Sequence, residues 1–254
     1  MKHTQLSILL ISTLCCSNMA MADVNVTNVE LGYKAYTSST KTDNKGVFDQ
    51  SFVKLNHLAI VDWGNYFANI KLENPGQWSH DQSGQAGKTT LKALNIIEYN
   101  LGTTKFNLWG QNFISANKTV VEDNLYLGVS HDVSLAGVSI NYGLGANYTF
   151  ASLTPTNGEF NGMSGYATVL NLRYPLTVLG LKNMLSLNYE GQFDRATEHQ
   201  HLLGYRSYGH QIITTLKTNI SKSIYSKLHI THFDSWGSTP RGGIEYGVAI
   251  GMNF

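Results

Sequence analysis

Cysteine is almost absent from this chain of 254 residues, since the only two, Cys15 and Cys16, are adjacent near the amino terminus. They lie within a segment that has Lys2 at its start, an apolar run from Leu6 to Leu14 and a small-residue sequence ending at Ala22. This pattern predicts an export signal over residues 1–22 that is removed after Ala22. The exported segment would then have no thiol, which excludes disulfides, thiolate nucleophiles and cysteine-ligated metals.

Long hydrophobic runs are missing after residue 22. No stretch approaches the length of about 18 apolar residues that a membrane-spanning helix needs. The chain also lacks an excess of either charge. It has 18 basic and 17 acidic residues, and loss of Lys2 with the signal leaves 17 of each. Nucleic-acid-binding proteins normally have a basic excess, so we expect no nucleic-acid partner. Without a membrane-spanning helix, the chain can cross a membrane only as a closed β-barrel.

What the sequence does contain is alternation with a period of two residues, most clearly in its last eleven residues. Large apolar side chains occupy every second position from Ile244 to Phe254, with small or polar residues between them. Successive strand residues point to opposite sides, so this segment predicts a strand with one apolar face. Such a strand ending on an aromatic residue is typical of an outer-membrane barrel, and we expect the assembly machinery of that membrane to recognise it. The alternative is a half-buried strand of a secreted β-sandwich.

The same alternation, interrupted by clusters of Gly, Pro, Asn and Asp, predicts about twelve strands. Long connections alternate with short ones, as in barrels that have tight turns at one end and long loops at the other. All four prolines are expected in connections, because proline cannot donate to a strand ladder. The predicted fold is therefore all-β, a transmembrane antiparallel up-and-down β-barrel formed by residues 23–254. The expected strands cover residues 26–36, 50–62, 66–74, 88–99, 104–115, 122–134, 137–150, 163–174, 182–194, 207–220, 223–235 and 243–254.

The faces of these strands can be assigned from their charges. In the strand 138–150 the even-numbered positions, from Val138 to Phe150, are apolar and the odd-numbered positions between them are small or polar. A Lys or Arg facing lipid at the middle of the bilayer costs about 2–4 kcal/mol, so charged positions in the other strands are expected to face the interior. The strand 50–62 is apolar on both faces and its orientation stays open. The interior is thus predicted to be polar with both signs of charge, and its expected members include Lys71, Asn171, Arg173, Glu190, Asp194, Lys217, His229 and Glu245.

Other chemistry finds little support in the sequence. His199 and His201 could ligate a metal, but they lie in an expected loop without evident partner ligands, so no metal or other cofactor is expected. His131-Asp132 or the acids Glu190 and Asp194 could serve a barrel hydrolase. No Gly-x-Ser-x-Gly nucleophile motif is present, and the chain is not expected to be an enzyme.

Four short segments of the chain are distinctive: Tyr126-Leu-Gly128-Val129 followed by Asp132, Gly165-Tyr166 followed by Pro175-Leu176-Thr177, Tyr189-Glu-Gly191-Gln-Phe193-Asp194, and Gly251-Met-Asn253-Phe254. Together they resemble segments of the Tsx-like nucleoside-channel and OmpK family of outer-membrane proteins. The resemblance covers roughly residues 120–254, while the Trp-rich opening typical of nucleoside channels is missing. It implies a monomeric twelve-stranded barrel with a narrow pore, and some family members also serve as surface receptors for phage and colicins.

The expected function is therefore a passive outer-membrane diffusion channel for small polar solutes, with nucleosides as the implied solute. A nucleoside pore needs several weak stations, such as rings that stack on a base and acids that accept from ribose hydroxyls. Trp109, Tyr126 and Phe113 are the candidate rings for stacking on a base, if they face inward. Two alternatives stay open, a non-conducting barrel that binds partners through its loops and, less favoured, the barrel hydrolase. The candidate pore-lining residues are Lys71, Glu98, Trp109, Tyr126, Asp132, Asn171, Arg173, Glu190, Asp194, Lys217, His229 and Glu245.

Overall fold

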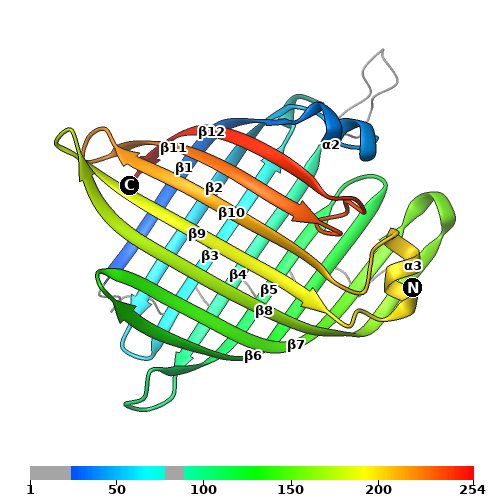
Figure 1. The fold of residues 1–254 in the computed structure, drawn as a ribbon, viewed down its shortest axis with the longest axis horizontal. Coiled ribbons are helices and arrows are strands. Elements are labelled where there is room, and N and C mark those ends of the chain that lie inside the picture. The colour runs from blue at the N-terminus through cyan, green and yellow to red at the C-terminus, as the bar shows by residue number, and fades with distance from the viewer. Residues whose placement is uncertain (1–23, 78–88) are drawn as a thin grey trace.

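Twelve antiparallel strands form a closed barrel in the computed structural model, which describes residues 24–77 and 89–254 (Figure 1). Each strand pairs with its neighbours in the sequence, and β1 pairs with β12 to close the barrel. The expected export signal, residues 1–22, lies outside the described residues. The strands are β1 (Val24–Tyr36), β2 (Gln50–Val61), β3 (Gly64–Glu73), β4 (Thr90–Asn100), β5 (Phe106–Ala116), β6 (Val120–Leu135), β7 (Val138–Leu153), β8 (Gly158–Val178), β9 (Leu181–Phe193), β10 (Gly209–Asn219), β11 (Ile224–Asp234) and β12 (Gly243–Asn253).

The two ends of the barrel differ in their connections. Short turns join β2 to β3, β4 to β5, β6 to β7, β8 to β9 and β10 to β11, and we call this side the turn end. The opposite side, the loop end, has the long connections and the helices α2 (Ser38–Asp43) and α3 (Thr197–Leu203) (Figure 1). Among the described residues no helix has the length and apolarity needed to cross a bilayer.

The expected strands are confirmed, and the differences concern β6 to β8. These strands extend further than predicted, so the connections expected at 116–121 and 151–162 shrink to residues 117–119 and 154–157. Pro175 was expected in a connection but lies inside β8, opposite Met184 of β9. It stands beyond the last pair that β8 makes with β7, Ser139 with Arg173, so β8 has a strand partner on only one side there. Proline is tolerated at such an edge position.

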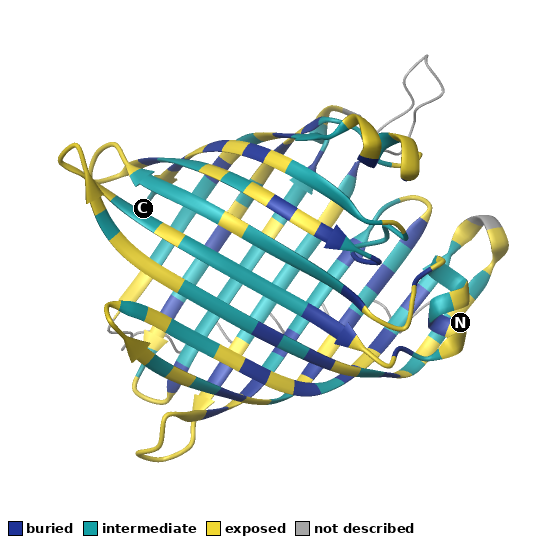
Figure 2. Cartoon of the chain, viewed as in Figure 1, coloured by how far each residue is buried: buried dark blue, intermediate teal, exposed yellow. Residues whose placement is uncertain are grey.

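Burial alternates from residue to residue along several strands, most clearly in β6, β7 and β12 (Figure 2). Exterior residues such as Leu31, Leu127, Leu144 and Val248 are each more than half exposed. Interior residues include Glu30, Lys34 and Gln111, which are nearly fully buried. The register also assigns the strand that the sequence left open, because Lys54 of β2 pairs with interior Glu30. Lipid can therefore cover the outside while water and polar groups occupy the inside.

This assignment predicts the effect of a charge on the outer face. Leu144 is 59% exposed near the middle of β7, so Leu144→Arg is expected to lower the free energy of unfolding by about 2–4 kcal/mol in a bilayer. Urea titration of the protein folded in vesicles measures it. Val138→Arg, at the first residue of β7 near the interface, is the control and is expected to cost no more than about 1 kcal/mol. Equal costs at both positions would contradict the placement of lipid around the barrel.

Candidate functional site

The candidate site is the interior of the barrel, where the strand register places nearly all of the predicted residues. Lys71, Glu98, Trp109, Tyr126, Asp132, Asn171, Arg173, Glu190, Lys217, His229 and Glu245 all belong to the inward rows of their strands. Contacts across the interior agree with this: Gln111 of β5 donates to Glu190 of β9 at 3.0 Å. Asp194 is different, because β9 ends at Phe193 and Asp194 follows in an exposed left-handed conformation with φ of 55°. The prediction that Asp194 continues the inward row is wrong.

One wall of the interior, formed by β5 to β9, is tightly packed. Trp109 and Tyr126 meet at 5.8 Å between ring centroids, pack on Ala167 and Val169, and are each only 1% exposed. The Tyr126 hydroxyl accepts a hydrogen bond from Gln192 at 2.7 Å. These rings point inward as expected but present no free face to the solution. They form a rigid wall rather than open stacking platforms.

Toward the turn end, the same wall carries a row of amides and carboxylates. Asn188 donates to Asn171 at 2.6 Å, Asn171 donates to Asn141 at 3.0 Å, and Asn141 donates to Asp132 at 3.0 Å. Glu98 of the adjoining strand β4 accepts from Ser130, Asn141 and Asn65. The row therefore links four neighbouring strands, β6 to β9, through amides that can donate and accept hydrogen bonds and a carboxylate that accepts them.

The opposite wall, formed by β1 to β4 and β10 to β12, is rich in lysine. Glu73 forms ion pairs with three ammonium groups, those of Lys34 at 2.9 Å, Lys71 at 2.6 Å and Lys92 at 3.3 Å. Lys34 also bonds Glu245 at 3.0 Å, and Glu245 lies 3.3 Å from His229. The pore-lining set predicted from the sequence lacked Lys34, Lys54 and Lys92. Period-two alternation could have found Lys34 and Lys92, which lie on the polar face of their strands, whereas Lys54 lies in the strand with two apolar faces.

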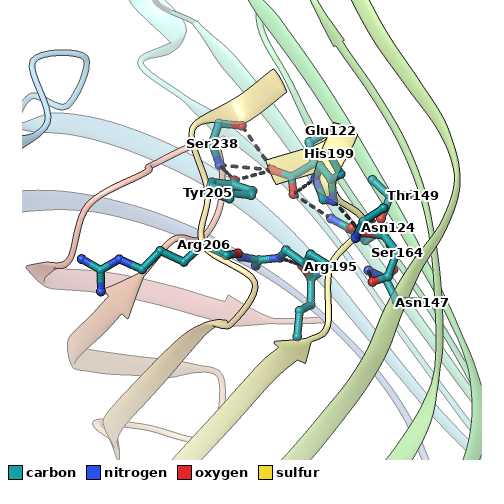
Figure 3. A network of polar contacts seen from close by, with 12 residues as sticks. Glu122, Asn124, Asn147, Thr149, Ser164, Arg195, His199, Tyr205, Arg206 and Ser238 are labelled. Carbon is teal, nitrogen blue, oxygen red and sulfur yellow. Dashed lines mark hydrogen bonds and ion pairs between the residues drawn. The ribbon is translucent and has the colours of Figure 1, made fainter. Parts of the chain in front are cut away.

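At the loop end a buried polar network fastens two connections to the barrel wall (Figure 3). Its centre is Glu122 of β6, which is 2% exposed. Glu122 accepts hydrogen bonds from the Tyr205 hydroxyl at 2.8 Å, the Ser238 backbone N–H at 3.2 Å and the Asn124 amide at 3.1 Å. Tyr205 belongs to the connection between β9 and β10, and Ser238 to that between β11 and β12. One carboxylate therefore holds both connections at the mouth of the barrel.

The network also holds α3 through His199 and keeps the Tyr205 hydroxyl protonated. His199 of α3 is fully buried, with its Nδ1 at 2.7 Å from Ser164 Oγ and its Nε2 at 3.8 Å from Glu122 Oε1. Burial, with Glu122 beside it, raises the pKa of the Tyr205 hydroxyl well above its ordinary range, so this group stays a hydrogen-bond donor. Ser164, His199 and Glu122 resemble a hydrolase triad in composition only. Ser164 and His199 have no exposed surface that a substrate could reach.

From the sequence, His199 and His201 were candidate metal ligands without evident partners. No group of three or more potential ligands is close enough to hold a metal ion within residues 24–77 and 89–254. At the mouth, a cavity of about 580 Å³ is lined by Asp43, Arg206, Asp234, Arg241 and Gly242. Two of these lining residues, Arg206 and Asp234, form an ion pair at 3.0 Å.

A closed twelve-stranded barrel with a lipid-compatible exterior and a charged, hydrogen-bonding interior defines a channel of the bacterial outer membrane. The solved structure of the NanC porin is similar, with a TM-score of 0.54 and 8% identity over 89% of this chain and 100% of that one. An outer-membrane channel from Pseudomonas putida F1 has a TM-score of 0.52 and 12% identity over 94% of this chain and 98% of that one. The model of the family described as nucleoside-specific channel-forming protein, Tsx, matches residues 31–254, and the chain belongs to this family.

The match begins at residue 31, so it also covers the first half of the chain, where the sequence segments had shown no resemblance. No curated protein matches the chain. The family forms channels and the chain is not an enzyme. Its environment is the lipid of the outer membrane, and its partners are the small solutes that pass through it.

Proposed function

We propose that this channel passes nucleosides by passive diffusion and discriminates them from sugars of similar size. The observation that carries the proposal is the row of Asn188, Asn171, Asn141 and Asp132 on one wall of the interior. Amides and carboxylates complement the donors and acceptors of base edges and ribose hydroxyls. A succession of such groups offers several weak stations, which transit requires because a tight site would stop it. The family description supports the same solute.

Swelling of liposomes that contain the folded protein tests this proposal. Adenosine and thymidine are expected to enter faster than sugars of matched size. Permeation no faster than in protein-free vesicles would refute conduction altogether and favour the alternative, a surface receptor. Equal rates for nucleosides and sugars would refute the nucleoside preference alone.

Glu190 is the residue whose change tests the lining most directly. It is partly exposed and accepts hydrogen bonds from Gln111 at 3.0 Å and from Gln211 at 2.9 Å. Glu190→Gln keeps the size but removes the charge that strengthens a bond from a ribose hydroxyl, so we expect the adenosine-to-sugar ratio to fall about threefold. Glu159→Gln, at an exposed position of β8, is the control. An unchanged ratio for Glu190→Gln would remove this residue from the solute path.

Three further features belong to the same proposal. The chain is exported with cleavage after Ala22, works as a monomer, and is recognised by the outer-membrane assembly machinery through the strand ending at Phe254. The long connections of the loop end are the surface that phage or colicins would contact. Mass spectrometry of the folded protein from outer membranes measures the cleavage site directly.

A further inference from the structure

Three lysines face one another directly on adjacent strands of the basic wall. Lys54 of β2 pairs with Lys71 of β3, and Lys71 pairs with Lys92 of β4. On the other side of the β1–β12 closure, Lys217 of β10 pairs with Lys227 of β11. Like charges in directly opposite positions destabilise a sheet. These five lysines, which we call the lysine row, therefore oppose the stability of the fold, and their placement calls for a reason other than stability.

The acidic residues nearby neutralise only part of the lysine row. Lys71 and Lys92 share Glu73, and Lys227 forms an ion pair with Glu30. Lys54 makes no hydrogen bond or ion pair with any of the residues that the structure describes, although Glu30 is its direct partner in the register. Lys217 lies over the ring of Tyr225, 3.8 Å from the centroid, and forms no ion pair with a carboxylate in the described part of the chain. Two inward lysines thus form no direct ion pair, although Glu30 lies nearby.

Several lysine side chains of this wall are accessible from the interior. The side chains of Lys71, Lys92 and Lys227 are each 22% exposed, whereas Trp109 and Tyr126 on the packed wall are each 1% exposed. A solute that crosses the barrel can therefore contact the lysine row. Neighbouring strands are about 4.8 Å apart, so three ammonium groups on successive strands can reach different oxygens of one multivalent anion.

We propose that the lysine row is an anion station of the channel, which binds the phosphate or carboxylate group of a passing solute. This inference rests on the channel function and adds a charge preference to it. Lys54 and Lys217 supply charge that no direct ion pair neutralises, and Lys71, Lys92 and Lys227 supply partly neutralised charge beside them. Because Glu73 and Glu30 share these ammonium groups, the station holds an anion weakly enough to release it, as conduction requires.

The test uses the full-length protein folded into planar bilayers and liposomes. Under a KCl gradient the reversal potential is expected to show preference for chloride over potassium, and the preference is expected to weaken at high salt because salt screens these charges. Adenosine monophosphate is expected to permeate faster than adenosine, and glucuronate faster than glucose. The phosphate and carboxylate probes distinguish the two possible anionic groups.

The double variant Lys54→Gln, Lys217→Gln is expected to lower the ratio of adenosine monophosphate to adenosine permeation by about two- to fivefold, the range that solvated ion pairs give. Lys222→Gln, exposed in the turn between β10 and β11, is the matched control and is expected to change nothing. The double variant with arginine at both positions keeps the charge and is expected to retain the ratio, which separates loss of charge from misfolding.

Cation preference in the unmodified channel, or an unchanged ratio in the glutamine variant, would overturn the anion station. The outcome is independent of the nucleoside preference. If adenosine enters no faster than ribose while the anion preference persists, the nucleoside proposal fails and the anion station stands. If adenosine enters faster than sugars but charge has no effect on permeation, the anion station fails and the nucleoside proposal stands.

Discussion

Replacing Glu122 with alanine is expected to release two loop-end connections and to raise the single-channel conductance. The Tyr205 hydroxyl, the Ser238 N–H and the Asn124 amide all donate to this carboxylate. Each buried donor left without an acceptor costs about 1–3 kcal/mol. Undocking lets Tyr205 and Ser238 reach water, so we expect the connections to leave the mouth while the strands stay paired.

Single-channel recording in planar bilayers measures this change as a larger and noisier open current. Limited proteolysis adds a second readout, because undocked connections between β9 and β10 and between β11 and β12 become cleavable. Glu159→Ala is the control, since Glu159 is an exposed acid toward the loop end of β8. A Glu122→Ala channel with unchanged current and unchanged protease resistance would show that this network does not constrict the mouth.

Gly165→Ala is expected to cause the largest loss of folded protein among single substitutions considered for the barrel wall. Gly165 has φ of 73°, at the point where the register between β7 and β8 shifts. A Cβ atom there would lie 2.0 Å from the carbonyl oxygen of Phe193 and 2.3 Å from that of Asp194. Both contacts are with backbone, so neither can be relieved by rotating a side chain.

The control for Gly165→Ala separates conformational strain from overlap. Gly180, in the turn between β8 and β9, has a similar φ of 76°, but a Cβ atom there meets nothing within 4 Å. Gly180→Ala is expected to lower the free energy of unfolding by only about 1–2 kcal/mol, because alanine is disfavoured in the left-handed conformation. Gly165→Ala has the same conformational cost and, in addition, the overlap with the backbone. We expect little folded protein from this variant, measured by electrophoresis as the amount of barrel whose migration changes on heating. Equal yields of both variants would contradict the close approach of β8 and β9.

The inward direction of most candidate residues could be predicted because a barrel strand alternates strictly between lipid and interior. A charge such as Lys71 or Arg173 sets the face of its whole strand, since the opposite face has to meet lipid. Asp194 was misplaced for a local reason. The alternation continues one residue past the end of β9, but the backbone turns into a left-handed conformation at Asp194, and alternation carries no information about where a strand stops.

The role of the aromatic residues could not be predicted in the same way. Trp109 and Tyr126 were expected as rings available to a solute, and the direction was right. Their burial depends on Ala167 and Val169 of β8 and on Gln192 of β9, which approach them only in the closed barrel. Pro175 illustrates the same point, because its acceptance within β8 depends on where β7 stops along its neighbour.

By itself, the sequence determined the strands, their apolar outer faces and the polar character of the interior, because a period of two residues is a local property that neighbouring side chains express directly. Only the tertiary structure decided which interior residues meet. The register of β2, β3 and β4 brings Lys54, Lys71 and Lys92 level with one another, and closure of the barrel sets this row opposite a packed wall. Such pairings depend on the stagger of strands around the whole cylinder, which no single segment of the chain encodes.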